Sequence, residues 1–230
     1  MTKVTSFHVT MSWRRNLATV YLLNQDNVNY YFIENEQYFD RDNVYGYYDD
    51  GERFAFYVLA VTELIHRQDL KSDIIHTHDW HTGMLACVCR ETPYYQDYFK
   101  NTKFIFTIHN PAFQGLLDPY SLGDLFNLPE DVYTSGKVRF KDMVSTLKAG
   151  IMYSDKITTV SPTHRNELLN PETSMGLDSV LRLREFDFKG VLNGIDYVEF
   201  NPNNDAIIPY QFNAVNYFKQ KILNKEEFFK

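Results

Sequence analysis

Residues 72–81 read Ser-Asp-Ile-Ile-His-Thr-His-Asp-Trp-His, a short apolar run that ends in three histidines, an aspartate and a tryptophan. The pattern recurs at 103–111, where Lys-Phe-Ile-Phe-Thr-Ile runs into His109, Asn110 and Pro111. Both runs have the length and composition of a buried strand. In an open parallel sheet, ligands bind in the crevice outside the carboxyl ends of the strands. The two stretches therefore predict a sugar, nucleotide or metal site at this edge of a sheet.

Strand-like and helix-like segments alternate along most of the chain. Besides the two runs above, apolar strand candidates lie at 157–160 and 190–192. Helical patterns lie at 54–65, 81–90, 143–151 and 163–169. This alternation predicts an α/β fold, a mostly parallel sheet with helices on both faces. Three further strand candidates, expected near one edge of a sheet, lie at 4–9, 18–23 and 28–34.

The C-terminal part of the chain differs in character from the rest. Asn201 to Asp205 form a cluster of turn residues, which suggests a boundary. The segment that follows is polar and aromatic without a clear strand pattern, and a helix is expected over 213–230. We therefore predict a domain over 1–205 and a helical segment over 206–230 that leads toward another domain.

Charge and composition exclude several classes of protein. The net charge is −7 and no cluster of Lys and Arg is present, which argues against a nucleic-acid partner. No signal peptide and no apolar run of about 18 residues is found, so neither export nor a membrane span is expected. Cys87 and Cys89 are one residue apart in a predicted helix, which supports neither a disulfide nor a CxxC redox pair. We expect a soluble protein of the reducing cytoplasm.

The histidine-rich end of the first strand suggests a metal site at first sight. Imidazoles and carboxylates two residues apart, such as His76, His78 and Asp79, can converge on zinc. The metallo-hydrolase pattern HxHxDH, however, needs a carboxylate directly before its last histidine, and Trp80 stands before His81. We therefore predict no metal. The competing interpretation places His76 and His78 in the core with satisfied nitrogens, and makes Asp79 the N-cap of the next helix.

The other strand ends carry candidates with two interpretations each. Asn110 either contacts a ligand beside His109 or bonds its own backbone in a turn, since Pro111 bars a helix there. Ser161, followed by Pro162, predicts a helix N-cap. Asn193 belongs to an Asn-Gly turn, where a ligand contact is allowed but not required. The chain has no adjacent glycine pair and no GxGxxG, Walker, GxSxG or HExxH motif, which weakens any claim to a phosphate cradle.

Several of these segments together resemble a known family. DIIHTHDWHTG (73–83) and FTIHNPAFQG (106–115) are similar to strand ends in the N-terminal domain of bacterial glycogen synthases and plant starch synthases. The same resemblance extends in order over nearly the whole chain, through 38–57, 147–167, 190–205 and Asn224-Lys225. That family has a GT-B architecture, in which two Rossmann-like domains face a cleft. It transfers glucose from ADP-glucose, or a related nucleotide sugar, to the non-reducing end of an α-1,4-glucan such as glycogen or maltodextrin, with retention of configuration.

The resemblance implies that this chain is one Rossmann-like half of such an enzyme. The KxGGL loop that follows the family's first strand has no match here, and the chain stops where the second domain with its nucleotide pocket should start. We expect a fragment that is inactive alone, uses no cofactor beyond the donor, and has the C-terminal domain as its partner. We also expect an exposed apolar edge and a tendency to self-associate. The alternative is a non-catalytic glucan-binding module.

The resemblance also implies roles for single residues. His109 matches the active-site histidine beside the transferred glucose, near its 6-hydroxyl. Asp79 and Trp80 match cleft residues that hold sugar rings, and Asn193 matches the asparagine that faces the donor sugar. Asn110 and Gln114 lie in the matched loop and are further candidates for substrate contact.

Overall fold

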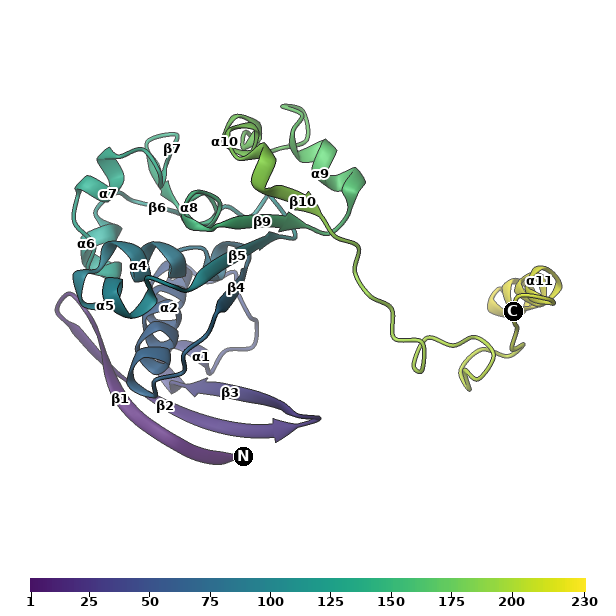
Figure 1. The fold of residues 1–230 in the computed structure, drawn as a ribbon. Helices are drawn as coiled ribbons and strands as arrows, with labels where there is room; N and C mark the ends of the chain where they lie inside the picture. Colours follow the sequence, from purple (N-terminus) through teal and green to yellow (C-terminus); the bar gives the residue numbers. More distant parts are fainter. The chain divides into compact units, whose positions relative to one another are not determined.

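The computed structural model describes all residues from Met1 to Lys230, in two compact units (Figure 1). The N-terminal unit is Met1–Val191 and the C-terminal unit is Leu192–Lys230. The division thus precedes the turn cluster at 201–205 by about ten residues.

A parallel sheet forms the centre of the N-terminal unit. Its strands are Ile74–His78 (β4), Lys103–Ile108 (β5), Lys156–Thr159 (β9) and Phe188–Gly190 (β10). Their order is β10-β9-β5-β4, and every neighbouring pair is parallel. The predicted α/β fold with a mostly parallel sheet is confirmed. The last strand lies two residues earlier than predicted, since it ends at Gly190.

The three predicted N-terminal strands are confirmed, and they form a sheet of their own, separate from the parallel sheet. Thr2–Met11 (β1), Arg14–Gln25 (β2) and Val28–Glu34 (β3) pair antiparallel in the order β1-β2-β3. The reason is local. Asp26 and Asn27 both have positive φ, 52° and 62°, as a two-residue type I′ hairpin turn requires. This tight connection pairs β2 with β3 as an antiparallel hairpin, and β2 has β1 on its other side.

The long helix Asp50–Arg67 (α2) packs on one face of the N-terminal sheet and beside the helices of the parallel sheet (Figure 1). The predicted helical stripe is confirmed and extends further at both ends. Phe7, Val9 and Met11 alternate along β1 and are all buried in the same core as α2 residues such as Phe56 and Leu59. The apolar face of β1, formed by every second residue, thus packs against the apolar face of α2, and both faces are buried.

A small antiparallel sheet lies in the connection between β5 and β9. Leu116–Leu117 (β6), Arg139–Phe140 (β7) and Met143–Ser145 (β8) pair in the order β6-β8-β7. The helix Thr146–Tyr153 (α8) follows directly. The predicted helix start at Met143 is therefore wrong, because Met143–Ser145 is a strand and the helix begins at Thr146. Ser145 ends the strand and caps the helix, because its hydroxyl accepts the Lys148 N–H at 3.1 Å.

Short helices complete the structure. In the N-terminal unit these are Glu36–Phe39 (α1), Asp79–Thr82 (α3), Leu85–Glu91 (α4), Pro93–Phe99 (α5), Ser121–Phe126 (α6), Asp131–Thr134 (α7), Pro162–Leu168 (α9) and Asp178–Leu183 (α10). The predicted Ser161 N-cap is confirmed, because its hydroxyl accepts the His164 N–H at 2.9 Å. Cys87 and Cys89 are buried free thiols.

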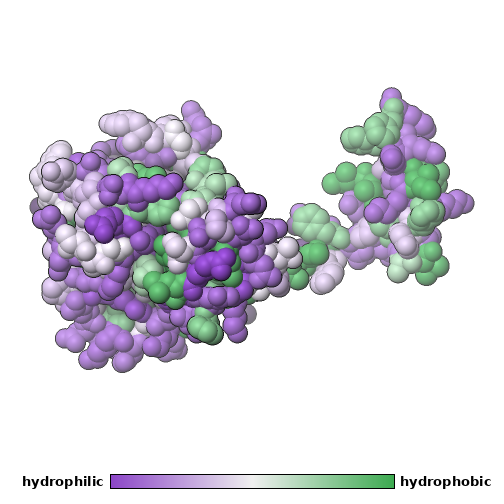
Figure 2. Space-filling model, turned by 90° about the horizontal axis from the view of Figure 1, so that it is seen from above, coloured by the Kyte–Doolittle hydropathy of each residue, from purple (hydrophilic) through white to green (hydrophobic).

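The C-terminal unit has one regular element, the helix Tyr217–Phe228 (α11). Hydrophobic side chains gather on this unit's surface, whereas hydrophilic ones dominate that of the larger unit (Figure 2). Phe218, Phe228 and Phe229 are 72%, 85% and 75% exposed. None of the helices is both long and apolar enough to cross a membrane.

Strand β4 is the outermost strand of the parallel sheet, and its Ile74 is 57% exposed. A bare strand edge with apolar side chains favours pairing between molecules. We therefore predict that the chain self-associates in a concentration-dependent way, and that Ile74→Lys reduces this. The control is Ile195→Lys, which places the same charge on an isoleucine outside any strand. Light scattering that finds a monodisperse wild-type monomer would contradict the prediction.

Candidate active site at the carboxyl edge of the sheet

The carboxyl ends of β4 and β5 are joined by one side chain. Asp79 directly follows β4, and its Oδ1 accepts the backbone N–H of His109 at 2.8 Å. Asp79 has a φ of 56°, a left-handed conformation that Asp tolerates better than most residues. The predicted N-cap role of Asp79 is wrong: His78 occupies that position, and the carboxylate reaches across to the neighbouring strand instead. The two predicted site residues are thus brought together.

The imidazoles of His78 and His109 form a direct pair. His78 Nδ1 and His109 Nε2 lie 3.1 Å apart, with ring centroids at 5.3 Å. In such a pair one nitrogen is protonated and donates a hydrogen bond, and the other accepts that bond. The tautomer of each ring therefore depends on its partner. His109 is exposed at the edge, and its Nδ1 has no partner within the chain. This nitrogen is free to meet a ligand.

A polar row continues from this pair across the sheet. His76 stacks on His78 at 4.3 Å, and its Nε2 lies 2.6 Å from Thr107 Oγ1, which lies 2.6 Å from Thr158 Oγ1. His76 and His78 are both exposed, so the prediction that they are core residues is wrong. Their nitrogens do find partners, as that interpretation required. The reason is the position of β4 at the end of the sheet, where nothing in the N-terminal unit covers this face.

Trp80 forms one wall of a cavity of about 510 Å³, the Trp80 cavity, beside the strand ends. Its ring meets Phe54 edge-on at 4.9 Å, and its carbonyl accepts the Thr146 hydroxyl at 2.7 Å. Gly115 permits this packing, because a Cβ there would lie 2.7 Å from the indole. The cavity is lined by Tyr47, Tyr48, Trp80, Phe113, Gln114 and Lys141.

Gln114 offers an unused acceptor at this cavity. Its side chain is 8% exposed, and its Nε2 donates to the Met175 carbonyl at 3.0 Å. Its Oε1 is buried without a partner. A buried amide oxygen left unpaired is costly, so a ligand hydroxyl that donated to it would bind favourably. Asp79, Trp80, His109 and Gln114 are together called the strand-edge site.

Two further predicted residues are Asn110 and Asn193. Asn110 directly follows His109 and is exposed, and its Oδ1 accepts the Ala112 N–H at 3.0 Å, as the turn interpretation requires. A substrate contact from Asn110 stays a prediction. Asn193 is exposed in the C-terminal unit. Its facing of a donor sugar stays a prediction.

Sequence reasoning missed Tyr47, Tyr48 and Lys141 as lining residues. A signal existed for Lys141: Lys141 and Asp142 form a two-residue turn with positive φ, 48° and 61°, between β7 and β8. Tyr47 and Tyr48 lie in the matched segment 38–57, but neither stands at the end of a predicted strand.

The side chains are not arranged as a metal site. No group of three or more His, Cys, Asp or Glu is placed to hold a metal ion. His81 packs against Phe54 at 4.5 Å and Trp80 at 4.3 Å, and does not join His76 and His78.

His76, His78 and His81 favour their neutral form. Partial burial lowers the pKa of His76, His78 and His81, and neighbouring imidazoles lower those of His76 and His78 further. A depressed histidine pKa means that the unfolded chain binds more protons just below the ordinary value of about 6.5. The contribution of these histidines to the free energy of unfolding is therefore fully present above about pH 6.5 and is lost as the pH falls below that value.

We predict that the midpoint temperature of thermal unfolding decreases when the pH is lowered from 7.5 to 5.5. The decrease should be smaller in His78→Asn. Asparagine keeps a hydrogen-bonding side chain but does not titrate. Calorimetry at both pH values measures the effect. An equal fall in the wild type and in His78→Asn would show that other groups cause it.

Comparison with known proteins places this site in a family. Residues 1–183 match the family model of the starch synthase catalytic domain. A glycogen synthase of Streptococcus agalactiae serotype Ia is 42% identical over 95% of this chain and 46% of its own length. One of Clostridium kluyveri is 43% identical, also over 95% and 46%. The chain thus spans about half the length of these curated relatives.

A solved structure agrees with this match. It is the catalytic domain of starch synthase IV from Arabidopsis thaliana, bound to ADP and acarbose. It superimposes with a TM-score of 0.82 at 29% identity, over 98% of this chain and 47% of that one. The family match covers well over half of the chain and the fold agrees throughout: the chain belongs to the starch synthase catalytic domain family.

Proposed function

We propose that this chain is the acceptor-side half of a retaining glucosyltransferase that moves glucose from ADP-glucose to the non-reducing end of an α-1,4-glucan. The observation that carries the proposal is the Asp79–His109 link beside a cavity walled by Trp80. The relatives are glycogen synthases, and the structural neighbour binds ADP and acarbose, which supports both substrate classes. No cofactor is needed beyond the donor, and the cytoplasm is the proposed compartment.

The residue types suit transfer of a glucosyl group. As the phosphate leaves, positive charge develops at the sugar ring, and fixed dipoles stabilise it better than mobile groups do. The Asp79 carboxylate fixes the His109 backbone, and the His109 Nδ1, which has no partner in the chain, is available to a sugar hydroxyl. Trp80 and Phe113 supply flat apolar walls for sugar rings, and Gln114 Oε1 supplies an acceptor.

The donor pocket is proposed to lie in the part of the relatives that this chain does not span. The 230-residue chain alone should then bind glucan without transferring glucose. If the protein has no such second domain, the alternative is a non-catalytic glucan-binding module.

Transfer of radiolabelled glucose from ADP-glucose to glycogen tests the proposal. The gene product with a second domain should transfer glucose, its His109→Ala variant should be at least about 100-fold slower, and the 230-residue chain should be inactive. UDP-glucose, run in parallel, decides the donor. Transfer by the 230-residue chain, or none by the longer product with either donor, would overturn the proposal.

A further inference from the structure

An ion pair of α2 holds the loop that carries Tyr47 and Tyr48 to the Trp80 cavity. This loop, residues 41–49, is called the tyrosine loop. Asp50 and Arg53 lie one helical turn apart, and Arg53 Nη1 donates to Asp50 Oδ1 at 2.5 Å. The Arg53 side chain is only 3% exposed. Breaking such a buried pair is costly because it leaves an uncompensated charge, so both side chains are held in place.

Arg53 also ties α2 to α1. Its Nε donates to the Tyr38 carbonyl at 2.7 Å, and Tyr38 is a buried residue of α1. The planar guanidinium presents its donors in a rigid fork, so the directions of the Tyr38 and Asp50 bonds are set together. One oxygen of the Asp50 carboxylate is thereby fixed, and the other is left for further donors.

The second Asp50 oxygen binds the tyrosine loop. Asp50 Oδ2 accepts the N–H groups of Gly46 and Tyr47, at 2.6 and 3.1 Å. Gly46 has a φ of 105°, which glycine adopts without strain. Hydrogen bonds to an ionised carboxylate are roughly twice as strong as those between neutral groups. Two adjacent residues of the loop are thus fixed by one charged side chain.

The Tyr47 ring lies at the centre of the loop. The guanidinium carbons of Arg41 and Arg53 lie 5.4 and 5.0 Å from its centroid. Its hydroxyl accepts the Asn43 N–H at 2.9 Å. Tyr48, in contrast, is 104% exposed, and its hydroxyl bonds no group of the chain. The position of Tyr48 at the cavity therefore depends on how its neighbour Tyr47 is held.

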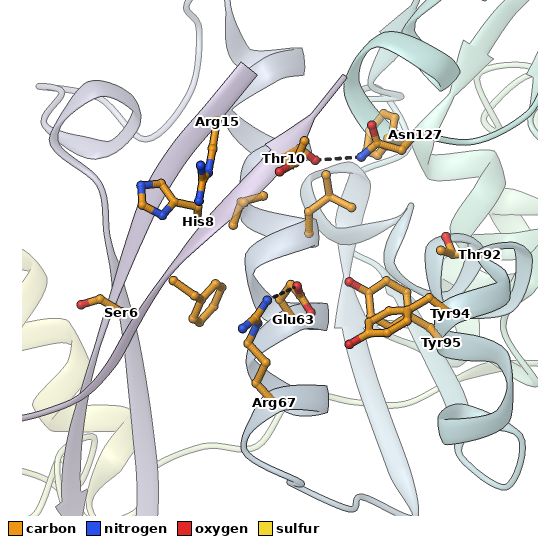
Figure 3. Close-up of a pocket in the computed structure, with 14 residues that line it drawn as sticks. Ser6, His8, Thr10, Arg15, Glu63, Arg67, Thr92, Tyr94, Tyr95 and Asn127 are labelled. Atoms are coloured by element: carbon orange, nitrogen blue, oxygen red, sulfur yellow. Dashed lines mark hydrogen bonds and ion pairs between the residues drawn. The ribbon is translucent and has the colours of Figure 1, made fainter. Parts of the chain in front are cut away.

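The other ion pair of α2 holds no loop. Glu63 and Arg67 are paired at 2.9 Å beside a cavity of about 780 Å³ along β1 (Figure 3). The Arg67 side chain is 48% exposed, and the second Glu63 oxygen, Oε2, has no partner. The same helix thus offers a matched reference, an acid–base pair that binds no backbone group of a neighbouring loop.

We infer that Asp50 and Arg53 are positioning residues for the glucan acceptor: they fix Tyr47, which places Tyr48 at the Trp80 cavity. That the ligand is a glucan rests on the proposed function, whereas the attachment of the loop does not. An exposed tyrosine ring gives a flat surface on which a sugar ring can pack. Such a contact is made equally before and during the reaction, so the pair should set the affinity for the acceptor and not the rate of glucose transfer.

Asp50→Asn tests the attachment of the loop. Asparagine has a single acceptor oxygen, so it can bind Arg53 or the loop but not both. Hydrogen exchange of residues 42–48, followed by mass spectrometry, should become about tenfold faster because bonds to a charged group are lost. Glu63→Gln removes the same charge from the same helix and should leave this exchange unchanged. Unchanged exchange in Asp50→Asn would overturn the inference.

Binding of maltoheptaose to the 230-residue chain tests the consequence. Trp13 and Trp80 are the two tryptophans, so Trp13→Phe leaves the fluorescence of Trp80 at the cavity as the signal. In this background Tyr48→Ala and Asp50→Asn should each raise the dissociation constant about tenfold. The double variant should bind no more weakly than Tyr48→Ala, because Asp50 acts through Tyr48. Circular dichroism checks that each variant is folded.

Additive losses in the double variant would overturn the inference, as would Trp80 fluorescence that does not respond to maltoheptaose. In the longer gene product, Asp50→Asn should raise the KM for maltoheptaose and leave kcat within about twofold. A lower kcat with an unchanged KM would also overturn it. The proposed function fails by a different result, the absence of glucose transfer by the unaltered longer product. The exchange and fluorescence measurements on the 230-residue chain decide the inference in that case too.

Discussion

Replacement of Gly83 by alanine is expected to cost about 3 kcal/mol or more of the free energy of unfolding. Gly83 lies between α3 and α4, and a Cβ there would sit 2.0 Å from the Thr146 carbonyl oxygen. That carbonyl cannot retreat easily. The N–H groups of Thr146 and Leu147 bond the carbonyls of Gly115 and Gln114 at 3.1 and 3.2 Å. Since a domain is stable by only about 5–15 kcal/mol, this loss would unfold a large fraction of the molecules on mild heating.

Urea unfolding followed by circular dichroism measures the effect of Gly83→Ala. The matched control is Gly123→Ala, within α6, where the nearest atom to an added Cβ is 3.9 Å away. Alanine is the better helix former, so this control should gain up to about 1 kcal/mol. If the urea midpoint of Gly83→Ala equalled that of the wild type, Gly83 could not be in close contact with the Thr146 carbonyl.

Replacement of Asp79 by alanine is expected to have the largest effect on activity. It removes the bond to the His109 N–H and leaves an alanine in a left-handed conformation, which costs about 1 kcal/mol by itself. The start of the His109 loop would then shift against Trp80. A displacement of about 1 Å in a positioned site costs about 100-fold in rate. We expect glucose transfer by the longer gene product to fall by that factor.

Asp79→Asn separates geometry from charge. Asparagine also tolerates positive φ and keeps an oxygen that can accept the His109 N–H. We therefore expect it to retain the fold and most glucan affinity, whereas Asp79→Ala loses both in part. Equal transfer rates in the alanine variant and the wild type would exclude a role for the link between the two strand ends.

The strands of the parallel sheet and the Ser161 cap could be predicted because their signals are local. Apolar runs at β4, β5 and β9 end in polar residues, and Ser-Pro marks a helix start wherever it occurs. The pairing of β1–β3 was missed because alternation reveals a strand but not its partner. The two-residue turn at Asp26-Asn27 was the available signal.

The site was predicted in part for the same reason. Sequence order places His109 and Asp79 at neighbouring strand ends, but 30 residues separate them, and only the folded sheet brings the carboxylate to the amide. The helical spacing of Met143, Leu147 and Ile151 concealed a strand that ends at Ser145. The exposure of His76 depends on which strand is outermost, and that is a property of topology alone.

The separate N-terminal sheet has a consequence for the order of folding. Its pairs are joined by two-residue turns, so β1–β3 close loops as short as any in the chain. Hairpins of this kind form in about 1–10 μs. Strand β5, in contrast, pairs with β9 across 51 residues, as Ile105 with Lys156 shows. The hairpins and α2 can therefore assemble while the ribosome still holds the parallel strands, and would give the emerging sheet a surface on which to collapse.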